Sequence, residues 1–404
     1  MQFRQTVFCF ILLLTSSGLQ AIELSSRKTV EVGKSPNRVL AVDMDNDGQD
    51  EVIVSSHAEG TISLLTFSSS STLLSKKIYE VGANPSELIV FDMNRDSYKD
   101  LIIANHETNS FHILYNDKEG AFEQTTISTF SVSSAPHIHT LGVGMFNKDD
   151  FPDVVVDSWA NSQLLIYFGK GDGSFEPQPQ VIDVHEQPRT NLVVTNIDGD
   201  NLSDIVTPAF RRDGVSVILG SQLNDAKRAN KAKLFSNAAK AFLVKTADVN
   251  GDGNQDILTV HRGSSFRDSN GEGLTLLLGN GKGEFEMAED FPLMVTGSPS
   301  FVAIGDINKD FIAELITANY RTNDMTVVFY EQTNRRYQQR SFPVGKRPES
   351  VAIGDIDGDG ENEVIVANRE SHSISLLDFT SLNLFSRRQI SEHTTTKPLA
   401  NIAR

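Results

Sequence analysis

The chemistry that the sequence offers most clearly is the binding of a hard cation by short acidic loops. A nine-residue stretch that starts at Asp43 carries side-chain oxygens at its first, third, fifth and ninth positions, supplied by Asp43, Asp45, Asp47 and Glu51. Carboxylate and amide oxygens gathered on one tight loop are the ligands that Ca²⁺ prefers. We therefore interpret the stretch as a calcium-binding loop.

The loop recurs seven times without gaps, at intervals of 49 to 58 residues. We number the copies loop 1 to loop 7 in chain order. Loops 2 and 4 to 7 also have Asp, Asn or Glu at all four ligand positions: Asp92, Asn94, Asp96 and Asp100; Asn196, Asp198, Asp200 and Asp204; Asp248, Asn250, Asp252 and Asp256; Asp306, Asn308, Asp310 and Glu314; Asp355, Asp357, Asp359 and Glu363. In loop 3, Met145 replaces the first ligand and leaves Asn147, Asp149 and Asp153. The sequence predicts about six structural calcium ions, and loop 3 as an empty site.

Two other positions of the loop support this interpretation. Position seven holds Gln49, Tyr98, Phe151, Leu202, Asn254, Ile312 and Glu361. Such variety fits a ligand that is a backbone carbonyl. Position six requires a sharp turn, often with positive φ, which Gly48, Gly253 and Gly360 suit and Asn201 and Asp150 tolerate. Ser97 and Phe311 suit it less well, so we expect distortion in loops 2 and 6.

Two alternatives to a calcium loop fit the sequence less well. An EF-hand needs Glu at position twelve and flanking helices, whereas position twelve here lies in β-branched runs, as at Val54 and Val366. Plain solvated Asp and Asn turns would explain a single copy. They explain less well six complete copies in register.

The elements around each loop predict an all-β fold. Each unit of about 50 residues contains a proline turn, a first strand, the acidic loop and three further strands, as in Arg38–Val42, Glu51–Ser55, Ile62–Phe67 and Lys77–Val81. Seven such units predict a seven-bladed β-propeller of four-stranded blades, with the loops between first and second strands. There is one fourth strand too many, at Lys28–Val32 or at Phe385–Ile390. We expect one of the two to close the ring.

Two glycine-rich turns, Gly169–Phe175 and Gly279–Phe285, resemble phosphate-binding loops. They run from strand to strand and no helix follows them, so we interpret them as hairpin turns between third and fourth strands.

The ends of the chain bear on its compartment. Residues 1–21 contain Arg4, the apolar run Val7–Leu14 and a small residue at Ala21, which predicts a signal peptide cleaved near Ala21. A buried N-terminal strand is the alternative. The domain prediction is then a propeller over 22–390 and a polar tail over 391–404. The only cysteine is Cys9, so the mature protein would have neither disulfides nor thiol chemistry. We expect a secreted, periplasmic or extracellular protein without a transmembrane anchor.

The formal net charge of −17 is accounted for largely by the loops, since six calcium ions would neutralise twelve negative charges. No basic face stands out, so nucleic-acid binding has no support.

The order Val-Gly-x-x-Pro, acidic loop and Phe-Gly-x-Gly-x-Gly-x-Phe resembles the FG-GAP/VCBS repeats over about residues 27–390. This resemblance implies a calcium-binding seven-bladed propeller like the head of integrin α chains, with Ca²⁺ at the loop ligands. The legs and membrane anchor of integrins are absent from this sequence, so an integrin role does not carry over.

A partner would be expected on the face opposite the acidic loops. Six residues after the last ligand of each loop stand His57, His106, Trp159, Phe210, Arg262, Tyr320 and Arg369. The proline turns bring Arg38, His137, His139, Arg189 and Arg347 to the same face, and an insertion, Gly263–Gly273, adds to it. Aromatic and guanidinium groups often anchor proteins or sugars. Alternatively, these are unrelated exposed turn residues.

The sequence favours a secreted binding or scaffold module for a protein or a glycan, with structural calcium and no catalytic residues. The alternative is a polysaccharide lyase or hydrolase on a calcium propeller, in which the histidines or Tyr320 act as acid or base. No carboxylate pair or triad spacing singles out such a site.

Overall fold

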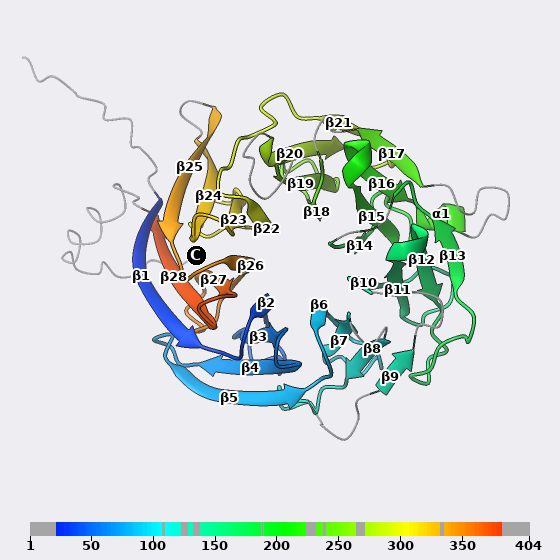
Figure 1. Cartoon of the computed structure of the whole chain (residues 1–404), viewed down its shortest axis with the longest axis horizontal. Coiled ribbons are helices and arrows are strands. Elements are labelled where there is room, and N and C mark those ends of the chain that lie inside the picture. The colour runs from blue at the N-terminus through cyan, green and yellow to red at the C-terminus, as the bar shows by residue number, and fades with distance from the viewer. Residues whose placement is uncertain are drawn as a thin grey trace, which may run out of the picture.

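The computed structural model describes residues 22–381, apart from 107–109, 123–127, 132–137, 187, 189, 224–231, 237–239, 264–270 and 332–334. These residues form seven four-stranded antiparallel sheets, which are arranged as blades around a central axis (Figure 1). The fold is therefore an all-β seven-bladed propeller, as predicted. We number the blades by the acidic loop that each contains.

In each of blades 1 to 4, the chain runs outward through four consecutive strands. Their bounds are, for blade 1, β2 (Pro36–Val42), β3 (Glu51–Ser56), β4 (Thr61–Phe67) and β5 (Leu73–Glu80); for blade 2, β6 (Pro85–Phe91), β7 (Asp100–Asn105), β8 (Ser110–Leu114) and β9 (Ser128–Ser131); for blade 3, β10 (Leu141–Gly144), β11 (Asp153–Ser158), β12 (Gln163–Tyr167) and β13 (Gln180–Asp183); for blade 4, β14 (Val193–Thr195), β15 (Asp204–Ala209), β16 (Gly214–Ile218) and β17 (Lys233–Ser236).

Blades 5 and 6 repeat this order, and blade 7 takes its outer strand from the start of the chain. The bounds are, for blade 5, β18 (Leu243–Ala247), β19 (Asp256–Arg262), β20 (Glu272–Gly279) and β21 (Phe285–Met287); for blade 6, β22 (Pro299–Gly305), β23 (Glu314–Asn319), β24 (Asp324–Glu331) and β25 (Arg336–Pro343); for blade 7, β26 (Pro348–Gly354), β27 (Glu363–Asn368), β28 (Ser373–Ser381) and β1 (Ile22–Glu31). Within the described residues, the short helices are η2 (Trp159–Asn161), η3 (Phe210–Arg212) and α1 (Gly220–Leu223).

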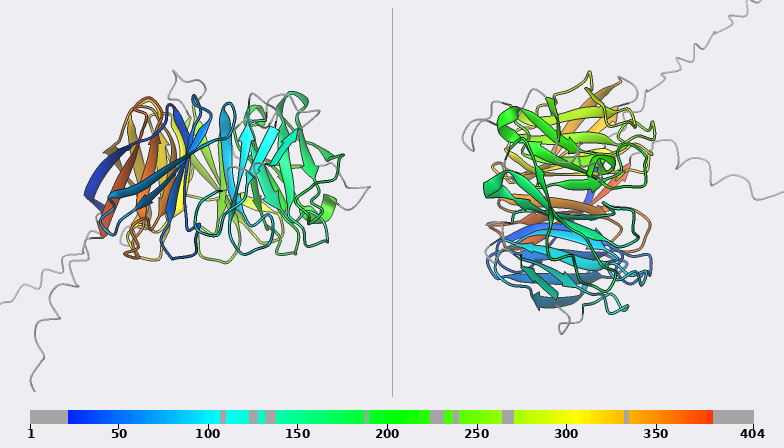
Figure 2. Two further views of the ribbon diagram at one scale, coloured as in Figure 1. Left: turned by 90° about the horizontal axis from the view of Figure 1, so that it is seen from below. Right: turned by 90° about the vertical axis from the view of Figure 1, so that its right-hand side faces the viewer.

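The core lies between the blades, because each sheet packs both of its faces against its neighbours. The second strands are buried along their whole length, as in β3 and β27. Their β-branched residues suit a strand that is covered on both sides. The outer strands alternate between exposed and buried residues or are mostly exposed, as in β5. Seen edge-on, the strands run across the thickness of a disc (Figure 2).

Polar side chains at the start of the inner strands link neighbouring blades. The Asn37 amide donates to the carbonyl of Pro85 at 3.0 Å, and the Ser300 hydroxyl donates to the carbonyl of Pro348 at 2.9 Å. The two donors occupy equivalent positions in blades 1 and 6. These bonds satisfy carbonyls that the inner strands would otherwise leave without partners.

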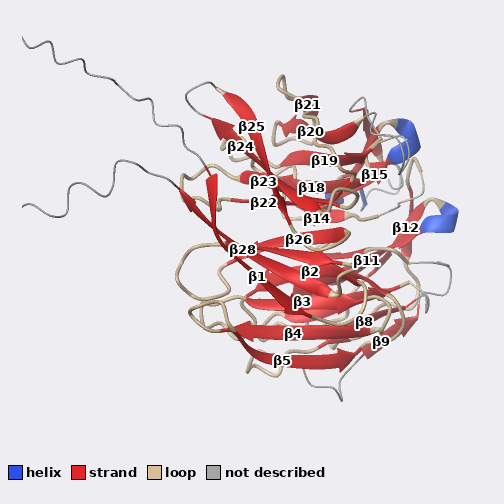
Figure 3. Ribbon diagram, turned by 60° about the vertical axis from the view of Figure 1, so that its left-hand side comes forward, coloured by secondary structure: helices blue, strands red, loops and turns tan. Residues whose placement is uncertain are grey.

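The ring is closed by the N-terminal strand. β1 pairs with β28 in antiparallel register, with Val30 opposite Ile374 (Figure 3). Of the two candidate closing strands, the one near the N-terminus, Lys28–Val32, is therefore used. The other, Phe385–Ile390, lies outside the described residues, as do the predicted signal peptide at 1–21 and the tail at 391–404.

Both glycine-rich turns are hairpins, as predicted. Gly169 bridges Phe175 between β12 and β13, and Gly279 pairs with Phe285 between β20 and β21. Within the described residues, no helix is long and apolar enough to cross a membrane.

Candidate metal centres and the opposite face

All seven acidic loops join the first strand of a blade to its second. Because the inner strands of all blades run in the same direction, the loops share one face of the disc. The turns between second and third strands lie at the other end of the second strands, hence on the opposite face.

The aspartate at position one organises the loops that have it. In loop 1, the backbone N–H groups of Asp47 and Gly48 donate to the two carboxylate oxygens of Asp43, at 3.2 and 2.9 Å. Loops 2, 5, 6 and 7 repeat both bonds. The two bonds draw the loop into a tight cup around the first ligand.

The expected distortion of loops 2 and 6 is wrong. Ser97 and Phe311 adopt φ of 72° and 66°, close to the left-handed value at Gly360. Both donate to the aspartate at position one, at 2.8 and 2.9 Å. These hydrogen bonds hold the turn although a side chain makes left-handed backbone unfavourable.

Loops 3 and 4 are the ones that differ. The Met145 side chain has no oxygen to accept a bond, and the side-chain amide of Asn196 has only one, which accepts the backbone N–H of Gly199 at 2.9 Å. Position six of these loops, Asp150 and Asn201, is not left-handed. The turn at position six thus depends on a carboxylate at position one rather than on the residue that makes the turn.

The carboxylate at position nine accepts the backbone N–H of position two in all seven loops, at 2.6 to 3.0 Å. Where position nine is aspartate, its other oxygen accepts a second backbone N–H from the end of the third strand or the residues just after it; for Asp100 this donor is Asn116, at 2.9 Å. The equivalent bonds involve Asp153, Asp204 and Asp256. A glutamate is longer by one methylene, and in loop 6 the other oxygen of Glu314 accepts from the Asn308 amide at 2.9 Å.

Three carboxylates converge in each of loops 1 and 7. Ligand atoms of Asp43, Asp45 and Glu51 lie within 4.8 Å of one another, and so do those of Asp355, Asp357 and Asp359. One oxygen of Asp357 is buried and has no hydrogen-bond partner. A convergent set of carboxylates with an orphaned oxygen fits a hard cation such as Ca²⁺.

Burial and neighbouring carboxylates raise the pKa of the glutamates at position nine. The pKa of Glu51 rises to about 7, and those of Glu314 and Glu363 to about 8. In each case burial is the larger cause and the nearby aspartates add to it. The charged loops are therefore electrostatically uncompensated without a cation. The assignment of calcium ligands stays a prediction in all seven loops.

Loop 2 has a cation of its own nearby. Lys118, from the segment after β8, lies 3.2 Å from a carboxylate oxygen of Asp96. Hydrogen bonds from the Tyr98 N–H and from Lys118 outweigh desolvation and lower the pKa of Asp96. Lys118 is far from loop 2 in sequence, so the spacing of the motif could not have revealed it.

Position eight carries a contact that sequence reasoning missed. The Asp50 carboxylate accepts the backbone N–H of Asp355 at 3.0 Å, and the Asn362 amide donates to the carbonyl of Asp306 at 3.0 Å. Ser203 and Lys99 contact Met145 and Asp43 in the same way. Each bond joins a loop to position one of the preceding loop around the ring.

On the opposite face, the predicted partner residues occupy equivalent places but differ in exposure. The backbone N–H groups of His57, His106, Tyr320 and Arg369 each donate to a carbonyl of the preceding proline turn, at 3.0 to 3.2 Å. Trp159 and Phe210 start the short helices η2 and η3. All six are half-buried.

The predicted placement of Arg262 in a turn is corrected by the structure. This residue ends β19, is only 8% exposed and packs over the rings of Phe242 and Tyr320, at 4.5 and 5.3 Å from their centroids. It supports the surface from below rather than forming a turn. Arg347 covers Tyr320 from another side, at 5.4 Å. Near Tyr320, Ser298, Arg321, Asn323, Arg347 and Glu370 complete the lining of a hollow of about 240 Å³.

A second aromatic group lies between blades 2 and 3. The His139 ring is 4.8 Å from the His106 ring and 5.8 Å from the Trp159 ring. The buried Asp157 accepts the backbone N–H of His139 at 2.7 Å and lies 3.2 Å from its Nδ1. Burial raises the pKa of Asp157 although the histidine contacts oppose the shift. His137, Arg189 and most of the insertion Gly263–Gly273 lie outside the described residues.

Comparison with known proteins supports the repeat and the fold. Residues 248–317, from the first residue of loop 5 into β23, match the family model of the FG-GAP-like repeat. The chain therefore contains an FG-GAP-like repeat within a seven-bladed β-propeller. No curated protein sequence matches.

Solved structures resemble the chain in fold. BBS1N, crystallised in complex with ARL6DN and soaked with lead, is 10% identical with a TM-score of 0.59, over 89% of this chain and 97% of that one. A mercury-soaked crystal of the same complex gives a TM-score of 0.60 at 10% identity, over 88% and 96% of the two chains. A lectin of Agrocybe aegerita that recognises non-reducing terminal N-acetylglucosamine is 14% identical with a TM-score of 0.50, over 86% and 87%. At such identities, these likenesses establish the fold alone.

Proposed function

We propose that this chain is a secreted, calcium-stabilised binding module, which engages a protein or a glycan through the face opposite its acidic loops. The observation that carries the proposal is a series of six half-buried aromatic, imidazole and guanidinium side chains at equivalent places on this face: His57, His106, Trp159, Phe210, Tyr320 and Arg369. Such groups combine a rigid apolar surface with hydrogen-bonding edges, which suits binding anchors.

Calcium has a structural role in this proposal. The loops lie on the far face from the anchors, so the ions would stabilise the blades without touching the partner. Extracellular calcium modules commonly have a Kd of roughly 10⁻⁴–10⁻³ M, which suits a calcium-rich compartment. The apolar run Val7–Leu14 supports export to such a compartment.

Propellers of similar fold bind partners of both proposed classes: BBS1N is in complex with a protein, and the mushroom lectin recognises a sugar. Their low identity lends no residue-level support.

A second candidate is an enzyme acting on a polysaccharide, favoured by one observation. Asp157 holds His139 by its Nδ1, an arrangement that fixes the tautomer of a histidine acting as an acid or base.

Binding to a glycan array that includes non-reducing terminal N-acetylglucosamine, and crosslinking to cell-surface proteins, would test the proposal. For the ligand identified in this way, we expect Trp159→Ala and Tyr320→Ala to weaken the affinity tenfold or more. The matched control is Phe311→Ala, which removes a 97% exposed aromatic ring from the loop face. Equal loss in the control, or binding unaffected by either variant, would contradict the assignment of the face. Turnover of an acidic polysaccharide that His139→Gln abolishes would favour the enzyme.

A further inference from the structure

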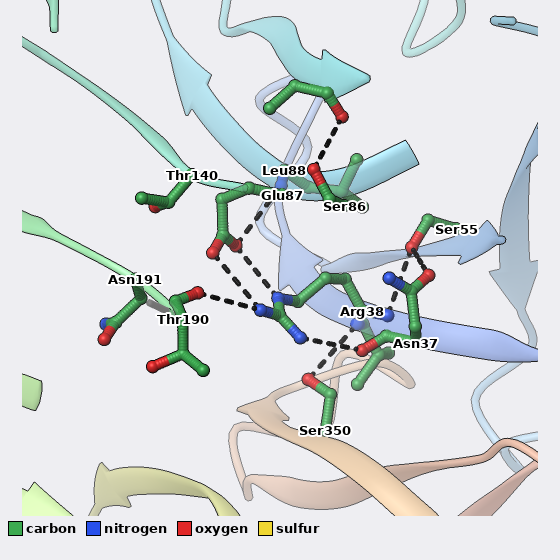
Figure 4. A network of polar contacts seen from close by, with 12 residues as sticks. Asn37, Arg38, Ser55, Ser86, Glu87, Leu88, Thr140, Thr190, Asn191 and Ser350 are labelled. Atoms are coloured by element: carbon green, nitrogen blue, oxygen red, sulfur yellow. Dashed lines mark hydrogen bonds and ion pairs between the residues drawn. The ribbon is translucent and has the colours of Figure 1, made fainter. Parts of the chain in front are cut away.

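The centre of the ring holds two cations and one carboxylate. Arg38 of β2 donates from Nε to Glu87 of β6 at 3.1 Å (Figure 4). Its Nη2 lies 3.5 Å from both the other oxygen of Glu87 and the carbonyl of Thr190, which stands just before β14. Arg38 thus connects blades 1, 2 and 4 around the axis.

Most hydrogen-bonding atoms of Arg38 and Glu87 are already used, so the pair has little capacity to bind a third charged group. The remaining Arg38 nitrogen, Nη1, donates to the carbonyl of Asn37 at 3.1 Å, and Glu87 also accepts the backbone N–H of Leu88 at 3.3 Å. Glu87 is only 8% exposed. Its single negative charge is therefore engaged by Arg38.

The second cation is Lys245 of β18. Its Nζ lies 4.6 Å from the centroid of the Phe301 ring, and the Arg38 guanidinium lies 5.4 Å from the same centroid. Among the described residues, Lys245 has no hydrogen-bond or ion-pair acceptor. Lys245 is half-buried, so its ammonium is partly desolvated. This desolvation lowers the pKa of Lys245; Arg38 lowers it further and Glu87 opposes both.

No other group on the inner strands supplies the missing charge. The inner strands, all of them described, carry one further ionisable residue, Glu349 of β26, whose carboxylate lies 3.9 Å from Arg369. Within the group of Arg38, Glu87 and Lys245, one positive charge is left over. A desolvated ammonium without a hydrogen-bond acceptor is unfavourable. An anion that only accepts hydrogen bonds would supply both the acceptor and the balancing negative charge.

We propose that Lys245, beside Arg38 and the face of Phe301, binds a carboxylate group at the centre of the ring. A carboxylate matches the single surplus charge and can accept bonds from the Lys245 ammonium. Its source is either a small free carboxylate or an acidic side chain of a bound partner. The site needs no calcium, because it lies on the inner strands and not in the acidic loops.

Titration of the calcium-loaded chain with ¹³C-acetate, followed by NMR at constant ionic strength with sodium chloride as the balance, tests the site. We expect saturable binding to the wild type and to Lys77→Met, which removes an exposed lysine from β5. Lys245→Met should weaken binding tenfold or more, whereas Lys245→Arg should retain it. Thermal melts with saturating calcium check that every variant folds. Lys245→Met should melt no lower than the wild type, because it removes an unpaired charge.

Competition by two capped tripeptides separates the sources. If Gly-Asp-Gly displaces acetate and Gly-Asn-Gly does not, the site accepts an acidic side chain. Acetate binding that neither peptide displaces assigns the site to a free carboxylate. No saturable acetate binding by the wild type, or equal binding by folded Lys245→Met, would overturn the proposal.

Discussion

At the scale of single residues, position one of each loop has more influence than its place in the motif suggests. An aspartate there accepts two backbone N–H groups and holds position six in left-handed backbone, even when position six is Phe311. Where Met145 stands instead, neither bond forms and loop 3 keeps three of the four predicted ligands. An aspartate at position one is thus the organiser of the turn as well as a predicted ligand.

Restoring this aspartate should create a calcium site. If the loops bind calcium as proposed, Met145→Asp should bind one ion more per chain than the wild type. At free calcium 100-fold above Kd, the added site would contribute about 2.7 kcal/mol to the free energy of unfolding. Equilibrium dialysis with elemental analysis measures the stoichiometry, and Met145→Leu is the control without an oxygen. A stoichiometry that does not rise would show that loop 3 lacks more than its first ligand.

His261 should make the free energy of unfolding depend on pH. It is 2% exposed and contacts the hydroxyls of Thr259 and Thr275 at 2.9 and 3.0 Å. Burial lowers its pKa from 6.5 to about 4. Between these values the unfolded chain binds a proton that the folded chain does not, so stability is present above pH 6.5 and is lost as pH falls toward 4.

The loss attributable to His261 should reach about 2 kcal/mol at pH 5 relative to pH 8. Urea unfolding at saturating calcium measures the free energy of unfolding of the wild type and of His261→Gln at both pH values. The difference between the two proteins isolates the contribution of His261, because all other groups contribute equally to both. Identical pH dependence of the two would mean that His261 is protonated at little cost in the folded state.

The sequence could predict the place of those residues whose surroundings are set by residues nearby in the chain. The loop positions follow from a spacing of nine residues and were placed on a common face. The burial of Arg262 and the ion pair of Lys118 with Asp96 depend on contacts between distant segments. The bonds from Asp50 to Asp355 cross the closure of the ring. Spacing within one motif holds no signal for such contacts.

At the scale of elements, closure by β1 completes the only blade built from both ends of the chain. Ile22 is 3% exposed and belongs to the same core cluster as Phe342 and Phe379. Without β1, this core would open and β28 would present an unpaired edge.

A chain that starts at Val32 should therefore fail to fold cooperatively, whereas one that starts at Ile22 should fold. The loss includes the ladder to β28 and the burial of Ile22, and is comparable with the roughly 5–15 kcal/mol that stabilises a typical domain. Circular dichroism melts and size-exclusion chromatography at saturating calcium compare the two. A compact, cooperative melt of the shorter chain would contradict the role of β1 as the closing strand.

The strand order within a blade was predictable, because four apolar runs separated by turns recur in each unit. Which terminal strand closes the ring was not, because the sequence offers one candidate near each end, Lys28–Val32 and Phe385–Ile390, and only the pairing partner of β28 distinguishes them. The one-turn helices at Trp159 and Phe210 also escaped prediction. They replace tight turns of similar composition and carry no helical periodicity.

At the scale of the whole molecule, the placement of charge matters more than its total. Much of the formal charge of −17 comes from the loops, and the fold gathers the loops on one face of the disc (Figure 2). Repulsion among them acts in the folded state and is relieved when the chain unfolds. It should therefore oppose folding whenever no cation is bound.

Salt should consequently stabilise the calcium-free protein and have little effect on the calcium-loaded one. At about 0.1 M salt the screening length is roughly 10 Å, so charges on neighbouring loops are increasingly shielded above that concentration. We expect the melting temperature in chelator to rise by a few degrees between about 0.05 and 0.5 M sodium chloride, and to rise much further with millimolar calcium at low salt. Scanning calorimetry across both series measures the two effects. A salt response of equal size with and without calcium would place the repulsion elsewhere than in the loops, and the absence of any calcium response would overturn the structural role of the ion.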